Sequence, residues 1–336
     1  MHAIELSGPE PSDLRRVSLP DPGPVGHGQA LVRMRAAAFN YLDRLVATGG
    51  YPGALYPNIP VADGAAEVVA IGDGVESVSV GDRVAVHPKA LWIAGAGTAR
   101  NNGAMRGVTI PGSLVELALV DATSLVVAPA HLGFEAIASL PIPATTGWNA
   151  LRAGEIGPGS TVVLPGTGVT ALQTLQLAKA AGARVIVTSS SDEKLDRARS
   201  LGADEGINYR MIPQWQDEVL RLTDGVGADL VLETTGADTF ARSLAAVRHG
   251  GTVYAIGFVS GRDTPLDVLT VIGKAIRLIG GNTGSADDFR AATNAIAAHG
   301  IEPVVARTFG VRDIAGAYAA LLAGEQFGKI AITLDW

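Results

Sequence analysis

Two patterns of hydrophobic positions divide the chain. Up to about residue 120, short apolar runs are separated by turn residues, which is typical of β-strands. The expected strands cover 30–34, 65–71, 83–86 and 115–120. The stretch 95–112 has no period and is rich in glycine, so a surface loop is expected there. The first part of the chain is therefore predicted to be an all-β module.

From about residue 160 onward, apolar strands alternate with segments of helical length. Strands are expected at 161–164, 184–188, 206–209, 230–232 and 252–256, and helices at 169–181, 192–201, 213–223 and 239–247. This alternation predicts a doubly wound α/β domain with a parallel sheet. Ser190 and Glu193 have the spacing of a capping box at the start of the second helix. After residue 281, helices 286–299 and 313–322 and strands 304–306 and 329–333 are expected to return to the β module.

Composition and charge exclude several classes of protein. Hydrophobic residues make up 47% of the 336 residues and charged residues 18%, which indicates a folded chain. The net charge is −7 without any run of Lys or Arg, so neither nucleic acid nor membrane is expected as a partner. The absence of cysteine excludes disulfides, thiolate zinc sites and cysteine nucleophiles. The chain start does not resemble a secretion signal and no apolar stretch is long enough to span a membrane, so a cytoplasmic protein is expected.

A glycine-rich turn carries the clearest chemical signal. Gly166, Thr167, Gly168, Val169 and Thr170, followed by Ala171, form the pattern G-x-G-x-x-A between a predicted strand and a predicted helix. In such a turn the first glycine permits the tight bend, and the second lets backbone amides approach a pyrophosphate. The small third residue allows the helix to pack closely on the strand. The turn therefore predicts a dinucleotide-binding site.

The end of the second strand of this domain selects between the nicotinamide cofactors. NAD-preferring sites place an acidic residue there, which accepts a hydrogen bond from the ribose 2′-hydroxyl. Here Ser189 and Ser190 occupy the position, with Lys194 nearby and Tyr209 after the third strand. Hydroxyls and a cation suit a 2′-phosphate, so NADP(H) is the predicted cofactor. The alternative is that the serines only cap the helix and that Asp192 supplies the acid.

Several motifs together resemble the medium-chain dehydrogenase/reductase superfamily over essentially the whole chain. They are Pro60–Gly72, Val80–Val84, Thr145–Trp148, the Gly166 turn, Leu201–Asp204 and Phe327–Lys329. Within the superfamily, the chain is most similar to the zinc-independent quinone-oxidoreductase branch and to bacterial relatives often labelled alcohol dehydrogenases. The resemblance implies a GroES-like catalytic domain formed by 1–143 and 286–336. It also implies a Rossmann dinucleotide-binding domain at 144–285.

The resemblance points to a centre without metal. Zinc-dependent members hold their catalytic metal with Cys, His and Cys, and the matching positions here are Asn40, Asp63 and Ile142. One amide and one carboxylate do not make a zinc site, so no metal is expected. The six histidines (2, 27, 87, 131, 249 and 299) have no metal-ligand spacing and are expected to be surface or packed residues. Trp92 and Trp148 are expected in the core, with lining of the substrate site as the alternative for Trp92.

The same resemblance implies which residues meet the reactants. In the quinone-reductase branch, residues matching Asn40 and Tyr51 line the substrate cleft beside the nicotinamide, so Asn40, Tyr51 and Asp63 are the candidate catalytic residues. A turn residue packed for stability is the alternative for Tyr51. A second cleft tyrosine of some members corresponds to Leu45. Thr146 matches a threonine near the nicotinamide, and Gly257, Phe258 and Val259 match the segment that meets its carboxamide.

Three functions are open at this point. The predicted one is NADPH-dependent reduction of an activated double bond in a small-molecule quinone or α,β-unsaturated carbonyl, without metal. The second is alcohol–ketone interconversion, which in this superfamily normally relies on zinc. The third is a non-enzymatic NADPH-binding protein. A homodimer is expected, because Ala275–Ile279 resembles a strand that many members pair across a two-fold axis.

Overall fold

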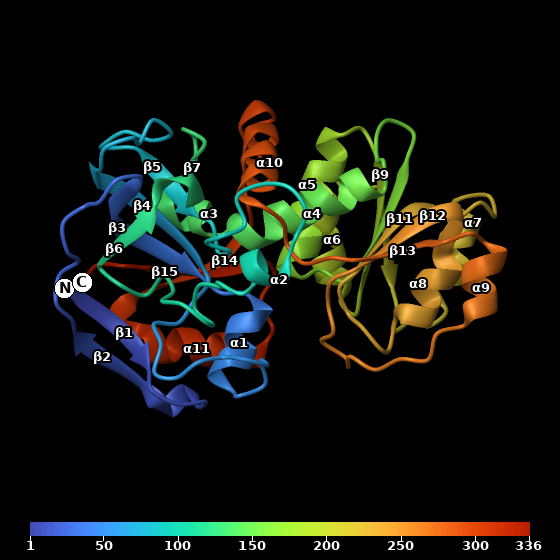
Figure 1. Ribbon diagram of the computed structural model, residues 1–336. Helices are drawn as coiled ribbons and strands as arrows, with labels where there is room; N and C mark the ends of the chain where they lie inside the picture. Colours follow the sequence, from blue (N-terminus) through green and yellow to red (C-terminus); the bar gives the residue numbers. More distant parts are fainter. The chain divides into compact units, whose positions relative to one another are not determined.

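The chain forms two compact units in the computed structural model, which describes residues 1–336 (Figure 1). Unit 1 comprises Met1–Thr145 and Gly284–Trp336, and unit 2 comprises Thr146–Thr283. The helix α4 (Pro141–Ala153) contains the first crossing point between them. Unit 1 is therefore built from two separate parts of the sequence, whereas unit 2 is continuous.

A six-stranded parallel sheet forms the centre of unit 2. Its strands are β8 (Thr161–Pro165), β9 (Arg184–Ser189), β10 (Glu205–Asn208), β11 (Ala228–Glu233), β12 (Val247–Ala255) and β13 (Arg277–Gly280). Their order is β10-β9-β8-β11-β12-β13, with every neighbouring pair parallel. The order reverses beside β8, so right-handed crossovers place helices on both faces. The predicted doubly wound α/β fold is confirmed.

The helices of unit 2 follow the predicted alternation. They are α5 (Val169–Ala180), α6 (Asp192–Ser200), α7 (Trp215–Leu222), α8 (Phe240–Ala246) and α9 (Val268–Gly273). The expected capping box of Ser190 with Glu193 is wrong. Ser191 is the N-cap instead, and its hydroxyl accepts a bond from the Lys194 backbone N–H at 3.3 Å. Because β9 runs one residue further than expected, to Ser189, the cap also falls one residue later.

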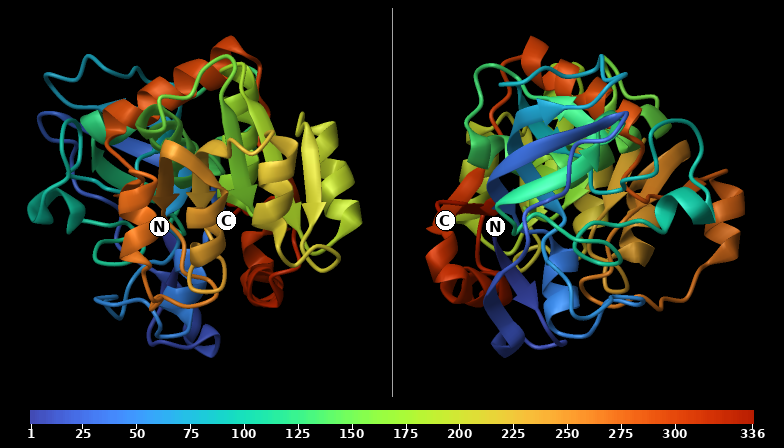
Figure 2. Two further views of the ribbon diagram at one scale, coloured as in Figure 1. Left: turned by 90° about the vertical axis from the view of Figure 1, so that its right-hand side faces the viewer. Right: turned by 60° about the vertical axis from the view of Figure 1, so that its left-hand side comes forward.

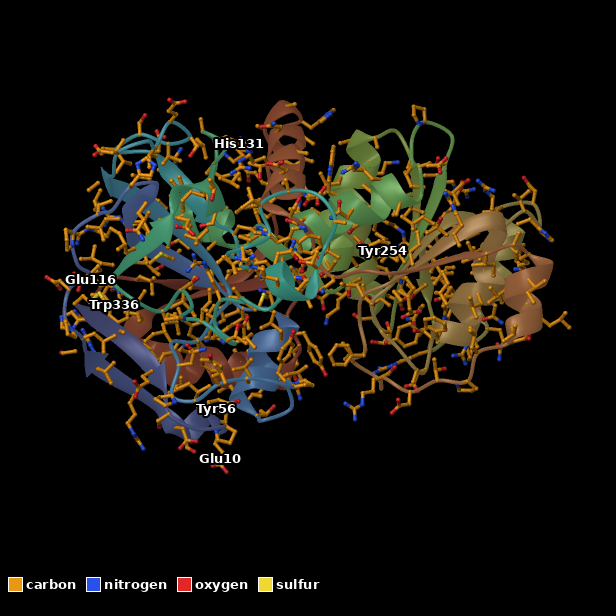
Figure 3. All side chains as sticks on the ribbon, in the orientation of Figure 1. Glu10, Tyr56, Glu116, His131, Tyr254 and Trp336 are labelled. Carbon is orange, nitrogen blue, oxygen red and sulfur yellow. The ribbon has the colours of Figure 1, made fainter.

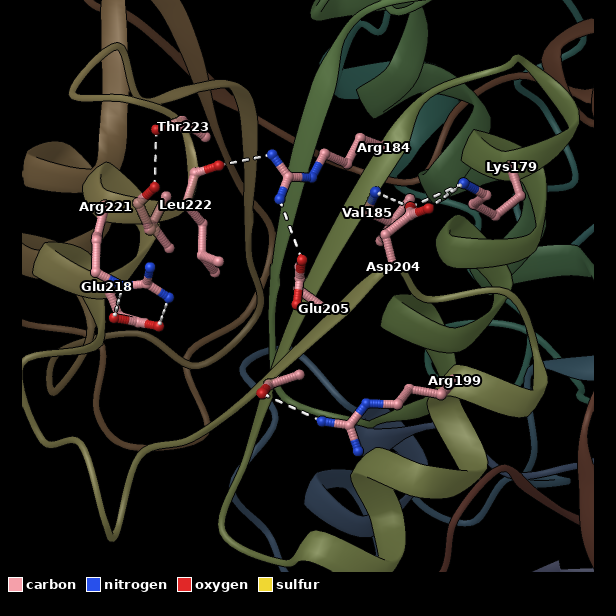
Figure 4. Close-up of polar contacts among 12 residues, drawn as sticks. Lys179, Arg184, Val185, Arg199, Asp204, Glu205, Glu218, Arg221, Leu222 and Thr223 are labelled. Carbon is pink, nitrogen blue, oxygen red and sulfur yellow. Dashed lines mark hydrogen bonds and ion pairs between the residues drawn. The ribbon is translucent and has the colours of Figure 1, made fainter.

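A polar cluster ties α5 to the strands beside it (Figure 4). Lys179 on α5 forms an ion pair of 2.8 Å with Asp204, and the same carboxylate accepts the Val185 backbone N–H of β9 at 2.7 Å. Arg184 donates to the Leu222 carbonyl at the end of α7 and to Glu205. These contacts fix the segment Leu201–Asp204, which connects α6 to β10.

Unit 1 is built around a seven-stranded sheet. Its strands are β3 (Gln29–Ala38), β4 (Asp63–Ile71), β5 (Arg83–Val86), β6 (Leu117–Asp121), β7 (Leu125–Val127), β14 (Val305–Gly310) and β15 (Lys329–Thr333). A separate hairpin consists of β1 (His2–Leu6) and β2 (Leu14–Ser18). The long strand β3 pairs antiparallel with β4, β6 and β15. The return of the C-terminal segment to the β module is therefore confirmed, because β15 adds directly to β3.

The expectation that the first 120 residues are purely β is wrong. Helix α1 (Tyr41–Ala47) follows β3, and the short α2 (Ala99–Asn102) lies inside the stretch expected to be a loop. Three more helices, α3 (Phe134–Ala138), α10 (Ala286–Ala298) and α11 (Ile314–Ala323), complete the unit. The periodicity of α1 is hidden by its length of seven residues, which gives only two helical turns.

The two ends of the chain meet in unit 1 and lie side by side in each view (Figures 1 and 2). Trp336, labelled in Figure 3, stacks on His2 with ring centroids 6.2 Å apart. Arg16 lies 5.8 Å from the centroid of the same tryptophan. None of the helices combines the length and apolar character needed to cross a lipid bilayer.

Candidate functional site

The carboxyl edge of the unit 2 sheet carries the glycine-rich turn. Gly166 follows β8 with φ +102°, a conformation that L side chains rarely adopt, so the tight bend depends on glycine here. Gly168 is the N-cap of α5, where no side chain satisfies the first free amides. Ala171 is 2% exposed and packs in the interior of the unit. The geometry thus shows the tight bend at Gly166 and the buried small residue at Ala171 that the sequence pattern predicts.

This edge fits the pyrophosphate of a dinucleotide. The N-terminus of α5 presents backbone amides that have no side-chain cap, and a helix N-terminus favours an anion. Open space surrounds the position where a side chain on Gly166 or Gly168 would lie. Thr146 on α4 is buried, and its hydroxyl has no hydrogen-bond partner. When bound, a nicotinamide cofactor supplies or accepts a hydride.

The residues expected to select the cofactor come together at the ends of β9 and β10. The Tyr209 backbone N–H donates to the Ser189 carbonyl at 3.0 Å, and Ser189 itself is buried. Lys194 lies in the first turn of α6, and its backbone N–H donates to the Ser191 hydroxyl. Asp192, the alternative acid, begins α6 and accepts a bond from the Asn208 side chain at 2.8 Å. No carboxylate therefore ends β9.

Gly257, Phe258 and Val259 follow β12 at the same edge, and Phe258 and Val259 are exposed.

A buried carboxylate that sequence reasoning missed organises the neighbouring loop. Glu233, which ends β11, accepts bonds from the Thr235 and Gly236 backbone amides and from the Thr239 and Ser243 hydroxyls. Its only sequence signal is an acidic residue at the end of an apolar strand.

A polar cluster inside unit 1 joins residues that are far apart in the sequence. The Asn40 side-chain nitrogen donates to Asp63 Oδ2 at 2.8 Å. Lys329 Nζ donates to Asn40 Oδ1 at 2.7 Å and to the same Asp63 oxygen at 2.9 Å. Asp63 and Lys329 are buried, whereas Asn40 is partly exposed. The structure therefore brings together two of the candidate catalytic residues and adds a third partner, Lys329.

The backbone two residues before Asp63 is strained. Val61 has φ +73°, which is an outlier for a β-branched residue and costs about 1–3 kcal/mol. Its carbonyl accepts the Ser113 backbone N–H at 2.7 Å. Gly112 packs so closely that an added Cβ would lie 2.5 Å from the Pro60 and Val61 carbonyl oxygens. The loop around Gly112 thus maintains the strained bend at Val61, just before β4 begins at Asp63.

Asp43, in the first turn of α1, is a second buried carboxylate in this region. Its oxygens accept the backbone N–H of Asn40 at 2.7 Å and that of Ala62 at 3.1 Å. Burial raises the pKa of Asp43 to about 7, with a further rise from Asp63, against the lowering by the backbone bonds and by Lys329. Sequence reasoning did not assign it a role.

Tyr51 lies in the turn after α1 and packs partly buried against the core of unit 1. Burial raises the pKa of Tyr51, and the nearby Asp43 carboxylate adds to the rise. The Leu45 carbonyl accepts the Tyr51 backbone N–H at 3.2 Å, which fixes the turn. Tyr318 on α11 is fully buried, and its hydroxyl has no partner. Tyr51 is therefore placed near Asp43 and keeps its phenol protonated at neutral pH.

The residues at the family's metal positions do not fit a zinc ion. The Asn40 and Asp63 side chains are already bonded to each other and to an ammonium group. Ile142 has no side-chain ligand atom, and its backbone N–H donates to Asp63 Oδ1 at 3.3 Å. Zinc in proteins prefers thiolate, imidazole and carboxylate ligands in a tetrahedral arrangement. No group of three His, Cys, Asp or Glu residues is arranged to hold a metal.

Comparison with known families covers both units. Residues 26–130 match the alcohol dehydrogenase GroES-like domain, and residues 170–298 match the family described as zinc-binding dehydrogenase. A zinc-type alcohol dehydrogenase-like protein of Schizosaccharomyces pombe is 36% identical, covering 94% of this chain and 93% of its own. A quinone oxidoreductase of Pseudomonas aeruginosa is 32% identical, covering 78% and 74%. An acryloyl-coenzyme A reductase of Metallosphaera sedula is 28% identical, covering 99% and 100%.

Solved structures similar to this chain include proteins of the same kinds as these relatives. A putative alcohol dehydrogenase of Sinorhizobium meliloti has a TM-score of 0.92 at 35% identity, covering 99% of this chain and 98% of its own. A mycobacterial protein solved in complex with NADPH has a TM-score of 0.81 at 28% identity, covering 99% and 100%. The chain therefore belongs to the medium-chain dehydrogenase/reductase superfamily and is an oxidoreductase that uses a nicotinamide cofactor.

Proposed function

We propose that this protein reduces an activated carbon–carbon double bond, in a quinone or an α,β-unsaturated carbonyl, with NADPH and without a metal. The observation that carries the proposal is the polar cluster of Asn40, Asp63 and Lys329 at the positions where zinc-dependent relatives bind their metal. An alkene conjugated to a carbonyl accepts hydride without a Lewis acid when fixed donors meet its oxygen. Relatives named quinone oxidoreductase and acryloyl-coenzyme A reductase support this class of acceptor.

In this proposal the two units have separate tasks. Unit 2 binds NADPH with the Gly166 turn, with Ser189, Ser190, Lys194 and Tyr209 around the 2′-phosphate. Thr146 and the segment 257–259 contact the nicotinamide. In unit 1, Asn40 and Tyr51 contact the acceptor and donate hydrogen bonds to the oxygen on which negative charge develops. Asp63 holds the Asn40 amide in place.

The deciding experiment uses matched pairs of an enone and its saturated ketone. NADPH oxidation is measured with each, and the product is identified. The proposal predicts faster turnover of the enone with the alkene reduced. Faster turnover of the ketone, with an alcohol as product, would favour the second candidate, alcohol–ketone interconversion, which the alcohol dehydrogenase names of several relatives support.

Elemental analysis of the purified protein tests the metal-free part separately. The donor set at Asn40, Asp63 and Ile142 leads us to expect no stoichiometric metal. One tightly bound zinc per chain, with activity lost to chelators and restored by zinc, would overturn it.

We further propose that the protein is a homodimer that pairs through unit 2. Strand β13 is an edge of the sheet, and α9 beside it exposes Leu269 and Ile272 to 77% and 69%. An edge strand flanked by exposed apolar side chains is commonly covered by a partner. Sedimentation would show a species of twice the chain mass, and Ile272→Asp should shift it toward the monomer.

A further inference from the structure

Lys329 is a charged residue that begins a strand whose next three residues are apolar. Its strand, β15, reads KIAIT and pairs with β14 on one side and β3 on the other. The side chain is 1% exposed, and the backbone N–H donates to the Val304 carbonyl at 2.8 Å. Lysine is almost never buried without a partner, so its environment must compensate the charge.

The compensation is a closed set of three hydrogen bonds. Lys329 Nζ bonds Asn40 Oδ1 and Asp63 Oδ2, and Asn40 Nδ2 bonds the same Asp63 oxygen. An ammonium group can only donate and a carboxylate can only accept. The oxygen of the Asn40 amide must therefore face Lys329 and its nitrogen must face Asp63. Two charged partners thus determine the orientation of a side chain that would otherwise be free to rotate.

This orientation leaves one donor of Asn40 unused. An amide nitrogen carries two N–H groups, and Asp63 accepts from this nitrogen at a single oxygen. Asn40 is partly exposed, whereas its two partners are buried. The second N–H is therefore held in a fixed direction by groups that a substrate does not displace.

We propose that Lys329 is the positioning residue of the reaction centre, a built-in cation that holds the Asn40 amide so that its free N–H donates to the acceptor oxygen. The inference rests on the proposed function, in which Asn40 contacts the acceptor. Two of the three positions matching metal ligands in zinc-dependent relatives, 40 and 63, bond this ammonium directly. The cation of the centre is thus part of the polypeptide and is supplied by its C-terminal strand.

Two roles of Lys329, neutralising the Asp63 charge and positioning Asn40, predict different kcat values for variants. Lys329→Met removes the ammonium but leaves the Asp63 carboxylate buried without a cation, so this variant alone does not separate the two roles. The comparison that separates them is Asp63→Asn against Asp63→Asn/Lys329→Met, because neither variant buries an unpaired carboxylate. If Lys329 only neutralises Asp63, the second change has no further effect on kcat. If Lys329 positions Asn40, the second change lowers kcat about 30- to 100-fold further, while the affinity for NADPH is unchanged.

A double-mutant cycle with Asn40→Ala identifies the group through which Lys329 acts. We expect Asn40→Ala to lower kcat about 100-fold, and Lys329→Met in that background to lower it by less than about threefold more. Multiplicative losses would overturn the proposal. Lys179→Met is the control, because it removes a lysine–aspartate pair in unit 2 and should leave kcat unchanged.

The test of Lys329 can be interpreted whether or not the proposed enone reaction is confirmed. The kcat ratios compare variants on one acceptor, so they apply to whichever acceptor the wild type turns over, enone, quinone or ketone. Crystal structures of Asp63→Asn and of Asp63→Asn/Lys329→Met, which differ only at position 329, supply a readout independent of turnover. An Asn40 side chain that keeps its orientation without the ammonium would refute the positioning role, even if the enone reaction is confirmed.

Discussion

In unit 1 the candidate site consists of buried, charged side chains, whereas in unit 2 it consists mainly of backbone amides and hydroxyls at the ends of strands. Asp63 and Lys329 are almost fully removed from solvent and depend on each other. The Gly166 turn and the N-terminus of α5 need no charged partner within the protein. The two units are therefore expected to respond differently to the loss of a side chain. Loss of Asp63 or of Lys329 leaves the other charge of unit 1 buried and unpaired, whereas loss of Lys194 in unit 2 is expected to change mainly what is bound.

The largest expected difference is in stability. Lys329→Met should lower the free energy of unfolding by about 3–5 kcal/mol, because it leaves the Asp63 carboxylate buried without a cation. The matched Lys179→Met change in unit 2 breaks a partly exposed pair with Asp204 and should cost about 1 kcal/mol or less. Denaturant unfolding measures both. Equal losses would remove the contrast between the units.

The next largest effect concerns turnover in unit 1. Tyr51→Phe removes the hydroxyl that we propose as a donor to the acceptor oxygen, which typically costs on the order of 3 kcal/mol in the barrier, or about 100-fold in kcat. Steady-state kinetics with a saturating enone checks this. A rise in KM at constant kcat would mean instead that Tyr51 only forms the wall of the site.

A smaller and more selective effect is expected in unit 2. Lys194→Ala should weaken NADPH binding about tenfold and leave NADH nearly unchanged, because a charge-assisted contact to phosphate is worth roughly 1.5–3 kcal/mol. Ser189→Asp should reverse the preference by placing a carboxylate at the end of β9. Thermal unfolding should be unaffected by Lys194→Ala. Equal catalytic efficiency of the wild type with both cofactors would contradict this assignment.

The smallest net effect is the pH dependence of the free energy of unfolding. Two buried groups of unit 1, Asp43 and His87, contribute to it with opposite signs. Folding raises the pKa of Asp43 from 3.8 to about 7, so its stabilising contribution is present below pH 4 and is lost as pH rises toward 7. The Asp43 carboxyl group interacts electrostatically with four neighbouring groups, namely Asp63, Lys329, Tyr51 and Tyr318. Burial, with the cations of Lys89, Arg106 and Arg290, lowers the pKa of His87 from 6.5 to about 3. Its contribution is therefore present above pH 6.5 and is lost as pH falls.

Between about pH 4 and 6.5, Asp43 makes the free energy of unfolding fall with rising pH and His87 makes it rise. Each contributes a slope of at most about 1.4 kcal/mol per pH unit. His87→Phe should therefore make unfolding free energy fall more steeply with rising pH than in the wild type. Asp43→Asn should make it rise instead. Urea unfolding at several pH values measures the slopes, and parallel curves for all three proteins would refute the compensation.

Sequence reasoning recovered unit 2 much better than unit 1 for a physical reason. The Gly166 turn, the end of β9 and the first turn of α6 lie within about thirty residues of each other, so their spacing encodes their geometry. Lys329 and Asp63 are 266 residues apart, and they meet because β15 and β4 both pair with β3. A single lysine in an apolar strand signals burial but not its partner. Asp43 was hidden similarly, because a short helix start gives no sign of being inside the core.

The late position of Lys329 also affects how the protein is made. At roughly 5–20 residues per second, synthesis reaches Lys329 about 13–50 s after Asp63. During this interval β3 lacks β15 as a neighbour, and the Asp63 carboxylate has no ammonium to meet. Unit 2, whose residues are continuous, already has all its strands before β14 and β15 are synthesised. Unit 1 is therefore the last part of the nascent chain to close, although its first residues leave the ribosome first.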